Sequence, residues 1–423
     1  MAATQDNSRK RGRDDELSIL PVGIGPRAFK NLRITETGRL VAAYNTTIIE
    51  QHYGPKMARY VEKLPELDRN NTMFVPNVSS PTNESTISGI LDLGDLLAIS
   101  EQSAVFRIQR TSFALIKYQA NCIELTLQRS LPEKPYLHPS VVEFVYTRMA
   151  NRIGLAPQVF SFSPPVRLCD SRNGQCAFRM FNESVTECKA NPFSSLRYMT
   201  MERIVGVDLF KHKFDQVDEV YPFSKAMLIG KEVIGMLKKL HTEARVVHGD
   251  IHMSNVMLEM PFSDSSVSLK FIDFARSSEN IARPNEVIRA PFELTHSLYS
   301  AWELYGYKSS ARDDVARAVE MIARMINPQS YVDYLSELEE HDGADVYLWK
   351  RVGNIFITEE MPSVGIERYD PVDLLNETIR DEIRTQFQYV QSLVGQMDDI
   401  NAIPPYDEIR SVFELCYNLT RTA

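Results

Sequence analysis

The stretch that decides the fold is VVHGDIHMSNVML, residues 246 to 258. The valines before the polar cluster and the run Val256-Met257-Leu258 after it are typical of buried strand ends. Asp250 and Asn255 would therefore lie on a loop that is held at both ends, which is how a scaffold commonly presents catalytic groups. An Asp followed five residues later by an Asn is common by chance, and alone it predicts only a turn.

The composition is that of an ordinary globular protein. The 423 residues are 43% hydrophobic and 24% charged, with a net charge of −9 from 47 basic and 56 acidic side chains. Proteins that coat nucleic acid usually carry a basic excess, so no direct nucleic-acid partner is expected. The chain has no apolar run of about 18 residues that would predict a membrane span, and no signal-peptide core. Five cysteines predict free thiols in a reducing compartment. We therefore expect an intracellular, cytoplasmic protein with no membrane partner.

The patterning divides the chain into four parts. Residues 1–18 predict a disordered polar tail, in which RKRGR (residues 9–13) is either a nuclear import signal or a solvated charge run. Residues 19–91 form an N-terminal extension to which the sequence assigns no role. Residues 92–205 predict a strand-rich part, and residues 206–423 a helix-rich part.

Short apolar runs define the strand-rich part. LLAI, AVFRI and FALIKY, between residues 96 and 118, are β-branched or aromatic runs separated by polar turns, and they predict three antiparallel strands. PSVVEFVYTRMANRIG, residues 139–154, has apolar residues at helical spacing and predicts a helix that Gly154 ends.

A hairpin is predicted around Asn173-Gly174. Cys169 and Cys176 flank the hairpin and would face each other across it. A metal or redox role for the pair is the less favoured alternative, because no second CxxC motif or Cys/His pair accompanies it.

The helix-rich part contains three long amphipathic patterns and one short strand. The helices are predicted within residues 224–244, 310–327 and 380–397. SLKFIDFARS, residues 268–277, predicts a strand that ends in a polar loop at Asp273.

Three separate pieces of the chain carry the groups that phosphoryl transfer from a nucleotide needs. Lys117 ends the strand ALIK, Asp250 and Asn255 share one loop, and Asp273 follows an apolar strand. A lysine and Mg²⁺ neutralise the triphosphate, and carboxylate and amide oxygens hold the metal. A further carboxylate orients the attacking hydroxyl and takes its proton.

In these residues the sequence resembles the protein kinase superfamily. The catalytic loop H-R-D-x-x-x-x-N stands as HGDIHMSN (residues 248–255), D-F-G as DFA (273–275), and the strand lysine of V-A-I-K as Lys117. The resemblance implies an α+β, bilobal fold with a small β-rich N-lobe (92–205) and a larger α-helical C-lobe (206–423). It also implies ATP and Mg²⁺ as cofactors and a protein as substrate.

The resemblance gives each matching residue a role. Asp250 would be the catalytic base, and Asn255 and Asp273 would hold Mg²⁺. Lys117 would contact the α- and β-phosphates and pair with Glu143 on the helix of the N-lobe.

Two further assignments follow from the resemblance. Glu124 and Glu133 are weaker competitors of Glu143 for the pairing with the strand lysine. The hinge that takes the adenine would begin at Met201-Glu202 and include Ile204, since MERIVGVDL is similar to the hinge pattern of the family.

Later motifs narrow the resemblance to one branch. AWEL (301–304), RDDV (312–315) and PPYDEIR (404–410) are similar to segments of casein-kinase-1-like kinases, and HGDI…SN is similar to the vaccinia-related kinases within that group. The resemblance covers roughly residues 92–418, and it rests on the order and spacing of several motifs that are individually weak.

Some residues in these motifs favour structural roles. Asp314 would hydrogen-bond the backbone of the catalytic loop and hold it rigid. Glu303 and Arg312 would form a buried ion pair. His248 would pack and form a hydrogen bond near the metal-binding loop without taking part in the chemistry.

Four departures from the family pattern keep three functions open. The phosphate-covering turn in AISEQSAVF (98–106) has no glycine, Ala275 replaces the glycine of D-F-G, and Gly249 replaces an arginine. His252 stands where protein kinases usually have a lysine and is similar to aminoglycoside and choline kinases. A protein Ser/Thr kinase is favoured because the reacting groups are complete. The alternatives are a pseudokinase that serves as a protein-binding module, and a small-molecule kinase.

Gly249 also generates a testable expectation. The arginine that it replaces pairs, in many kinases, with a phosphate on the activation loop. Turnover of ATP by this chain should therefore be unchanged by phosphatase treatment, and a loss of turnover after treatment would contradict the expectation.

Overall fold

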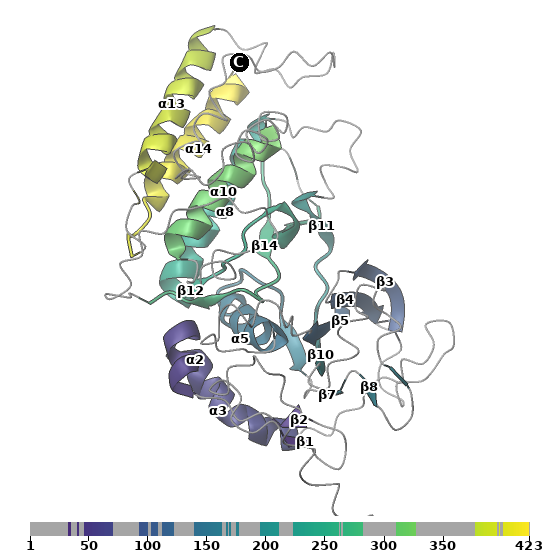
Figure 1. Cartoon of the computed structure of the whole chain (residues 1–423). Helices are drawn as coiled ribbons and strands as arrows, with labels where there is room; N and C mark the ends of the chain where they lie inside the picture. The colour runs from purple at the N-terminus through teal and green to yellow at the C-terminus, as the bar shows by residue number, and fades with distance from the viewer. Residues whose placement is uncertain are drawn as a thin grey trace, which may run out of the picture.

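The structure is a computed structural model, and it describes part of the chain. The described residues are 33–34, 40–41, 46–70, 93–99, 103–108, 112–121, 139–162, 166–167, 169–170, 175–176, 195–210, 223–261, 263, 265–281, 310–326, 377–395, 397 and 401–422. They form helices and small antiparallel sheets, so the predicted mixed α+β class is confirmed (Figure 1). The predicted tail 1–18, the turn 100–102, AWEL, Glu124, Glu133 and Glu303 lie outside the described residues.

A six-stranded antiparallel sheet contains the first predicted strands. Its main order is β3 (Leu93–Ile99), β4 (Ser103–Ile108), β5 (Ala114–Asn121), β10 (Ser195–Glu202), β6 (Val159–Phe162), and β7 (Val166–Arg167) also pairs with β10. The three strands predicted between residues 96 and 118 are confirmed as β3, β4 and β5. Lys117 lies in the middle of the sheet, opposite Val105 on one side and Met199 on the other.

The predicted helix of this part is α5 (Pro139–Asn151), which contacts β5, β6 and β10. It ends where expected, because Gly154 takes up a left-handed backbone conformation (φ +77°) that an L residue rarely adopts. The predicted hairpin is also present: β8 (Cys169–Asp170) pairs with β9 (Gln175–Cys176), with Cys169 opposite Cys176 in the register.

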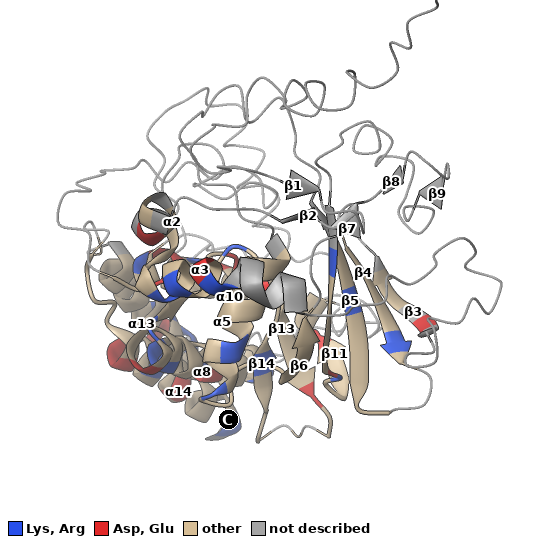
Figure 2. Cartoon of the chain, turned by 90° about the horizontal axis from the view of Figure 1, so that it is seen from below, with Lys and Arg blue, Asp and Glu red and all other residues tan. Residues whose placement is uncertain are grey.

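The N-terminal extension contributes two helices and a small hairpin. The hairpin pairs β1 (Arg33–Ile34) with β2 (Leu40–Val41). The helices are α2 (Thr46–Tyr53) and α3 (Pro55–Asn70). Figures 1 and 2 both show α3 beside α5, which it contacts.

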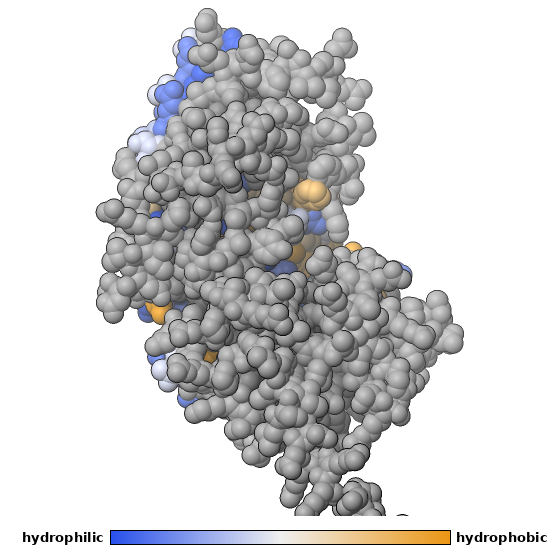
Figure 3. Space-filling model, viewed as in Figure 1, coloured by the Kyte–Doolittle hydropathy of each residue, from blue (hydrophilic) through white to orange (hydrophobic). Residues whose placement is uncertain are grey.

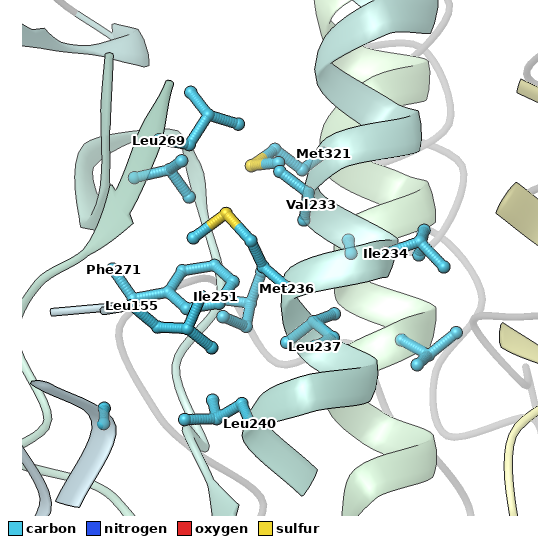
Figure 4. Packing of buried hydrophobic residues seen from close by; sticks show 14 of the residues in the cluster. Leu155, Val233, Ile234, Met236, Leu237, Leu240, Ile251, Leu269, Phe271 and Met321 are labelled. Atoms are coloured by element: carbon cyan, nitrogen blue, oxygen red, sulfur yellow. The ribbon is translucent and has the colours of Figure 1, made fainter. Parts of the chain in front are cut away.

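Three predicted helices of the second part are confirmed, and a fourth long helix follows them. They are α8 (Phe223–Lys239), which continues as the π-helical turn η3 (Leu240–Ala244), then α10 (Ala311–Ile326), α13 (Glu377–Gly395) and α14 (Tyr406–Thr422). Figure 4 shows apolar side chains of α8 pointing towards β14 and α10; those labelled on α8 and η3 are Val233, Ile234, Met236, Leu237 and Leu240. The helix α8 is thus the centre of this core.

The stretch at residues 246–258 lies between two small sheets, as its apolar flanks predict. Before it, β12 (Val246–Val247) pairs with β15 (Ser278–Glu279). After it, the 3₁₀ turn η4 (Met253–Asn255) leads into β13 (Val256–Glu259), the middle strand of the sheet β11-β13-β14. The outer strands are β11 (Gly206–Asp208) and β14 (Leu269–Phe271). The polar loop is therefore fixed at both ends.

The described surface mixes charges of both signs. Basic and acidic residues are interspersed along the helices in Figure 2, and the hydrophobic residues on the face drawn in Figure 3 form small, separate patches. Among the described helices, none combines the length and apolar character needed to cross a bilayer.

Close packing of α8 against α14 generates a stability prediction. A Cβ atom at Gly230 of α8 would lie 3.1 Å from the ring of Phe413 on α14, so the two helices meet without spare room. Phe413→Ala would leave a cavity there and should lower the free energy of unfolding by about 3–5 kcal/mol, as measured by urea denaturation. Leu415→Ala, at a partly exposed position on the same helix, is the matched control and should cost far less.

Candidate functional site

The predicted partner of Lys117 is in place. The Lys117 Nζ atom donates to both carboxylate oxygens of Glu143, each at 2.9 Å, and lies 3.4 Å from Asp273 Oδ2. A strand, a helix and a loop thus bring one ammonium between two carboxylates. Lys117 is 7% exposed and Glu143 2%, whereas the side chain of Asp273 is 40% exposed. Asp273 therefore forms the open edge of the cluster.

Burial and the charge of the ion-pair partner shift the pKa of each group in this cluster in opposite directions. Burial lowers the pKa of Lys117, but the charges of Asp273 and Glu143 outweigh burial and hold the pKa above its ordinary value. Burial raises the pKa of Glu143 to about 7, and the charge of Asp273 adds to the rise while Lys117 opposes it. Burial also raises the pKa of Asp273, but Lys117 outweighs it and the net shift is downward. Near neutral pH, Lys117 and Asp273 are charged and Glu143 titrates.

The backbone at Asp273 is strained in a way that orients its carboxylate. Its φ is +60°, in the left-handed region that residues other than glycine rarely adopt. Such strain persists where the surroundings impose it, often at functional sites. Here Phe274 is fully buried, and Ala275 N lies 3.4 Å from Asp273 Oδ1 as a long hydrogen bond. The buried ring holds the turn while the carboxylate faces Lys117.

The backbone of the loop at residues 248–255 is held by one buried carboxylate, as predicted for Asp314. Asp314 on α10 accepts hydrogen bonds from His248 N at 2.7 Å and from Gly249 N at 2.9 Å. His241 Nε2 lies 2.9 Å from the same carboxylate, and its Nδ1 lies 2.6 Å from the hydroxyl of Tyr406. The predicted anchoring role of Asp314 is confirmed, and the sequence did not anticipate that His241 and Tyr406 extend the network to α14.

His248 has the structural role that was predicted. Its Nε2 donates to the carbonyl of Ile272 at 3.0 Å, and its ring packs against Phe271 and Phe274 at centroid distances of 5.7 and 4.6 Å. Burial lowers the pKa of His248, so the imidazole is neutral. It holds the loop against the segment that follows β14.

Asp250 lies between Arg276 and His252. Arg276 Nη1 is 3.6 Å from Asp250 Oδ1, and His252 Nε2 is 3.7 Å from Oδ2. Asn255 Nδ2 donates to the Asp250 carbonyl at 2.9 Å and also lies 2.8 Å from His252 Nε2. Burial raises the pKa of Asp250, but His252 and Arg276 outweigh it and hold the pKa well below its usual range. The Asp250 carboxylate is therefore ionised throughout the neutral range.

Arg276 was missed by reasoning from the sequence. It stands three residues after Asp273, in the same polar loop, and no local pattern indicates that its guanidinium meets Asp250. The structure also explains the absence of an arginine at residue 249. Gly249 has φ +80°, and a Cβ atom there would lie 2.6 Å from the carbonyl oxygen of Arg276. No side chain fits at residue 249 without moving the backbone.

The residues predicted as a hinge lie on the connection between two sheets. Met201 and Glu202 end β10, and Met201 lies two residues beyond the register partner of Lys117, hence on the same face of the strand. Ile204 is half-buried in the short link to β11, and the carbonyl of Val205 accepts from Met260 N at 2.7 Å. The structure thus brings these residues to the end of the sheet that carries Lys117.

Asn255 and Asp273 fit a divalent cation held jointly with a nucleotide. Within the part of the chain that the structure describes, no cluster of three or more His, Cys, Asp and Glu side chains is arranged to enclose a metal. Mg²⁺ at nucleotide sites typically takes one or two protein oxygens, with phosphate and water completing its shell. The hydrogen bonds of the Asn255 side chain use Nδ2, which leaves Oδ1 for a cation. Ile272 N donates to the Asn255 carbonyl at 3.0 Å, so Asn255 lies beside the residue that precedes Asp273.

Comparison with known proteins gives no independent guide to this site. No family model matches the chain, and no curated protein matches it.

Glu143 generates a pH prediction that needs no activity assay. Its pKa rises from an ordinary 4.5 to about 7 on folding, so its contribution to stability is full below about pH 4.5 and is lost as the pH rises through about 7. The free energy of unfolding of the wild type, relative to Glu143→Gln, should therefore increase as the pH falls across this interval. Urea denaturation at several pH values measures this difference, in which other titrating groups cancel. Parallel curves for the two proteins would show that Glu143 keeps an ordinary pKa.

Proposed function

We propose that the chain is an ATP-dependent phosphotransferase with a bilobal, protein-kinase-like fold, which transfers the γ-phosphate of ATP to a Ser or Thr hydroxyl of a protein. The observation that carries the proposal is the meeting of Lys117, Glu143 and Asp273 within 2.9 and 3.4 Å. These residues come from three elements far apart in the sequence, and their types and order are those of the kinase motifs.

The arrangement of the elements supports the two-lobed reading. The six-stranded sheet and α5 correspond to the N-lobe expected over residues 92–205, and the helices around α8 to the C-lobe expected over residues 206–423. Residues 203–205 carry the chain from β10 to β11, as a hinge between lobes would. Met201, Glu202 and Ile204 are the residues we assign to binding the adenine.

We assign triphosphate binding to the open edge of the ion cluster, which Asp273 forms. Lys117, held by Glu143, would donate to the phosphate oxygens, and the half-exposed Asp273 carboxylate and the Asn255 amide oxygen would hold Mg²⁺. When bound, the metal neutralises negative charge on the phosphates. The protein side chains position the γ-phosphate and exclude other orientations, which supplies most of the catalysis in this reaction class.

Asp250 acts on the substrate hydroxyl. It orients the hydroxyl by accepting its hydrogen bond and takes the proton as the oxygen bonds to the γ-phosphorus; the bond from that phosphorus to the bridging oxygen breaks, and ADP leaves. The low pKa of Asp250 keeps the carboxylate ionised for this role. Arg276 and His252 flank the carboxylate and limit its rotation.

A small-molecule kinase is the second candidate, and one observation favours it. His252 lies in hydrogen-bond range of Asn255 and 3.7 Å from Asp250, so the residue that departs from the protein-kinase pattern faces the reacting groups. Labelled ATP offered with casein, and separately with a panel of alcohols and amines, distinguishes the two candidates by which acceptor becomes labelled.

Turnover by the native chain beside Asp250→Asn tests the proposal. Loss of the proton acceptor should lower kcat by about 100- to 10,000-fold, measured as ADP release with a protein acceptor. Asp381→Asn, on the exposed face of α13, is the matched control and should leave kcat unchanged. Undiminished activity in Asp250→Asn would show that Asp250 is not the base.

A thermal-shift titration completes this test. Ligand that binds only the folded chain raises stability by RT ln(1 + [L]/Kd), so ATP should raise Tm in a Mg²⁺-dependent manner in both the native chain and Asp250→Asn. A native chain that shows this shift but phosphorylates neither a protein nor a small-molecule acceptor would be a pseudokinase, and a chain with neither turnover nor shift would contradict the proposal.

A further inference from the structure

The two helices of the N-terminal extension pack into the same core as α5. Ile49, Tyr53, Met57 and Val61 are all buried, at the one-face spacing of an amphipathic pair of helices. In addition, α3 contacts α5, and α2 contacts β15. Residues 46–63 thus touch both the helix that carries Glu143 and the strand that follows Asp273.

The contact with α5 is specific as well as apolar. The hydroxyl of Tyr146, which is fully buried, donates to the carbonyl of Tyr53 at the end of α2. A buried hydroxyl needs such a partner, so this bond sets the position of Tyr146. Tyr146 follows Glu143 by three residues and lies on the same side of α5. The helix α5 is therefore hydrogen-bonded to α2 one turn away from the Glu143 carboxylate that binds Lys117. The rings of Tyr60 and Phe144 add a contact at 5.6 Å.

The contact with β15 is equally close. The Glu279 carboxylate accepts a hydrogen bond from Lys56 N in the first turn of α3. Gly54, between the two helices, has φ +96°, and a Cβ atom there would lie 2.6 Å from Glu279 Cβ. Glu279 in turn pairs with Val246, two residues before the catalytic loop begins. The junction of α2 and α3 thus contacts β15, which follows Asp273 in the chain. The strand β15 pairs with β12, which precedes Asp250.

We propose that residues 46–63 are a brace that positions the reacting groups, because the brace holds α5 and β15 in the arrangement in which Lys117 meets both Glu143 and Asp273. Tyr146, Gly54 and Glu279 are its positioning residues, and none of them touches the reacting atoms. The inference rests on the proposed function for its catalytic consequence. The N-terminal extension thus helps to form the site, because its residues 46–63 hold α5, the helix that carries Glu143.

Gly54→Ala in the full chain tests the brace, with Gly154→Ala as its matched control. Both glycines have a positive φ, so both substitutions carry the same kind of backbone strain. At Gly54 the new methyl group collides with Glu279, whereas at Gly154 it meets nothing within 4 Å. An effect of Gly54→Ala beyond that of Gly154→Ala therefore reports the collision with Glu279 rather than the backbone strain that both variants carry.

The expected result has a structural and a kinetic part. Amide hydrogen exchange in residues 141–149 should be faster in Gly54→Ala than in the wild type or in Gly154→Ala. In the kinetic assay, kcat/KM for ATP should fall by about 10- to 100-fold because Lys117 loses its fixed partner. The KM for ATP should rise while the KM for the protein acceptor stays as in the wild type; a general loss of folding would instead lower the apparent kcat and leave both KM values unchanged.

A second pair of variants tests the brace if Gly54→Ala does not fold. Glu279→Ala removes the acceptor for Lys56 N, while Glu279→Gln keeps a carbonyl oxygen in its place. Glu279→Ala should reproduce the faster exchange in α5 and the lower kcat/KM for ATP, and Glu279→Gln should restore both towards the wild type.

Unchanged exchange in residues 141–149 of both Gly54→Ala and Glu279→Ala would overturn the brace, as would equal kinetic losses in Gly54→Ala and Gly154→Ala. The exchange measurement also separates the two proposals. If the wild type shows no turnover but α5 exchanges faster in the brace variants, the proposed function fails while the brace stands as what holds Glu143 against Lys117.

Discussion

A buried ammonium between two carboxylates is the interaction on which the rest of this site depends. Lys117 from β5, Glu143 from α5 and Asp273 from the loop after β14 satisfy one another where water is largely excluded. Loss of one member of a buried charge pair costs about 3–5 kcal/mol, so the strand, the helix and the loop cannot shift independently. The cluster holds two carboxylates and one ammonium, and near neutral pH any remaining negative charge lies towards its exposed side, at Asp273. That edge attracts a further cation, such as the Mg²⁺ that we propose.

A second buried carboxylate fixes the other half of the site. Asp314 accepts hydrogen bonds from two successive backbone amides, those of His248 and Gly249. It therefore fixes the backbone immediately before Asp250. Its bond to His241, and from there to Tyr406, joins the loop to the packed helices α8, α10 and α14. The packed helices thus hold the loop through these polar contacts, in addition to the apolar contacts of its buried residues Ile251 and Met253.

Local patterns predicted the elements well and their long-range contacts unevenly. The strands around Lys117, the helix of Glu143 and the strand ends at residues 246–258 follow from periodicity and turn residues, which act over a few positions. The pairing of Lys117 with Glu143 was predictable only because the motif order resembles a known family. Nothing local indicates that Gly54 meets Glu279, since the two are 225 positions apart and the fit depends on tertiary packing. The role of Arg276 was hidden for the same reason.

Residues 249 and 275, at which this chain differs from the kinase motifs, and residue 276 lie around one backbone contact. A catalytic loop that lies close to the segment after Asp273 needs one residue without a side chain at the point of contact. In this chain that residue is Gly249, where the carbonyl of Arg276 leaves no room for a Cβ atom. Arg276 then directs its guanidinium to Asp250 from the opposite side of the contact, 3.6 Å from Oδ1. With the close approach made at Gly249 and the turn held by buried Phe274, Ala275 has a negative φ and needs no glycine. The glycine at residue 249, the arginine at residue 276 and the alanine at residue 275 are thus compatible with one backbone contact.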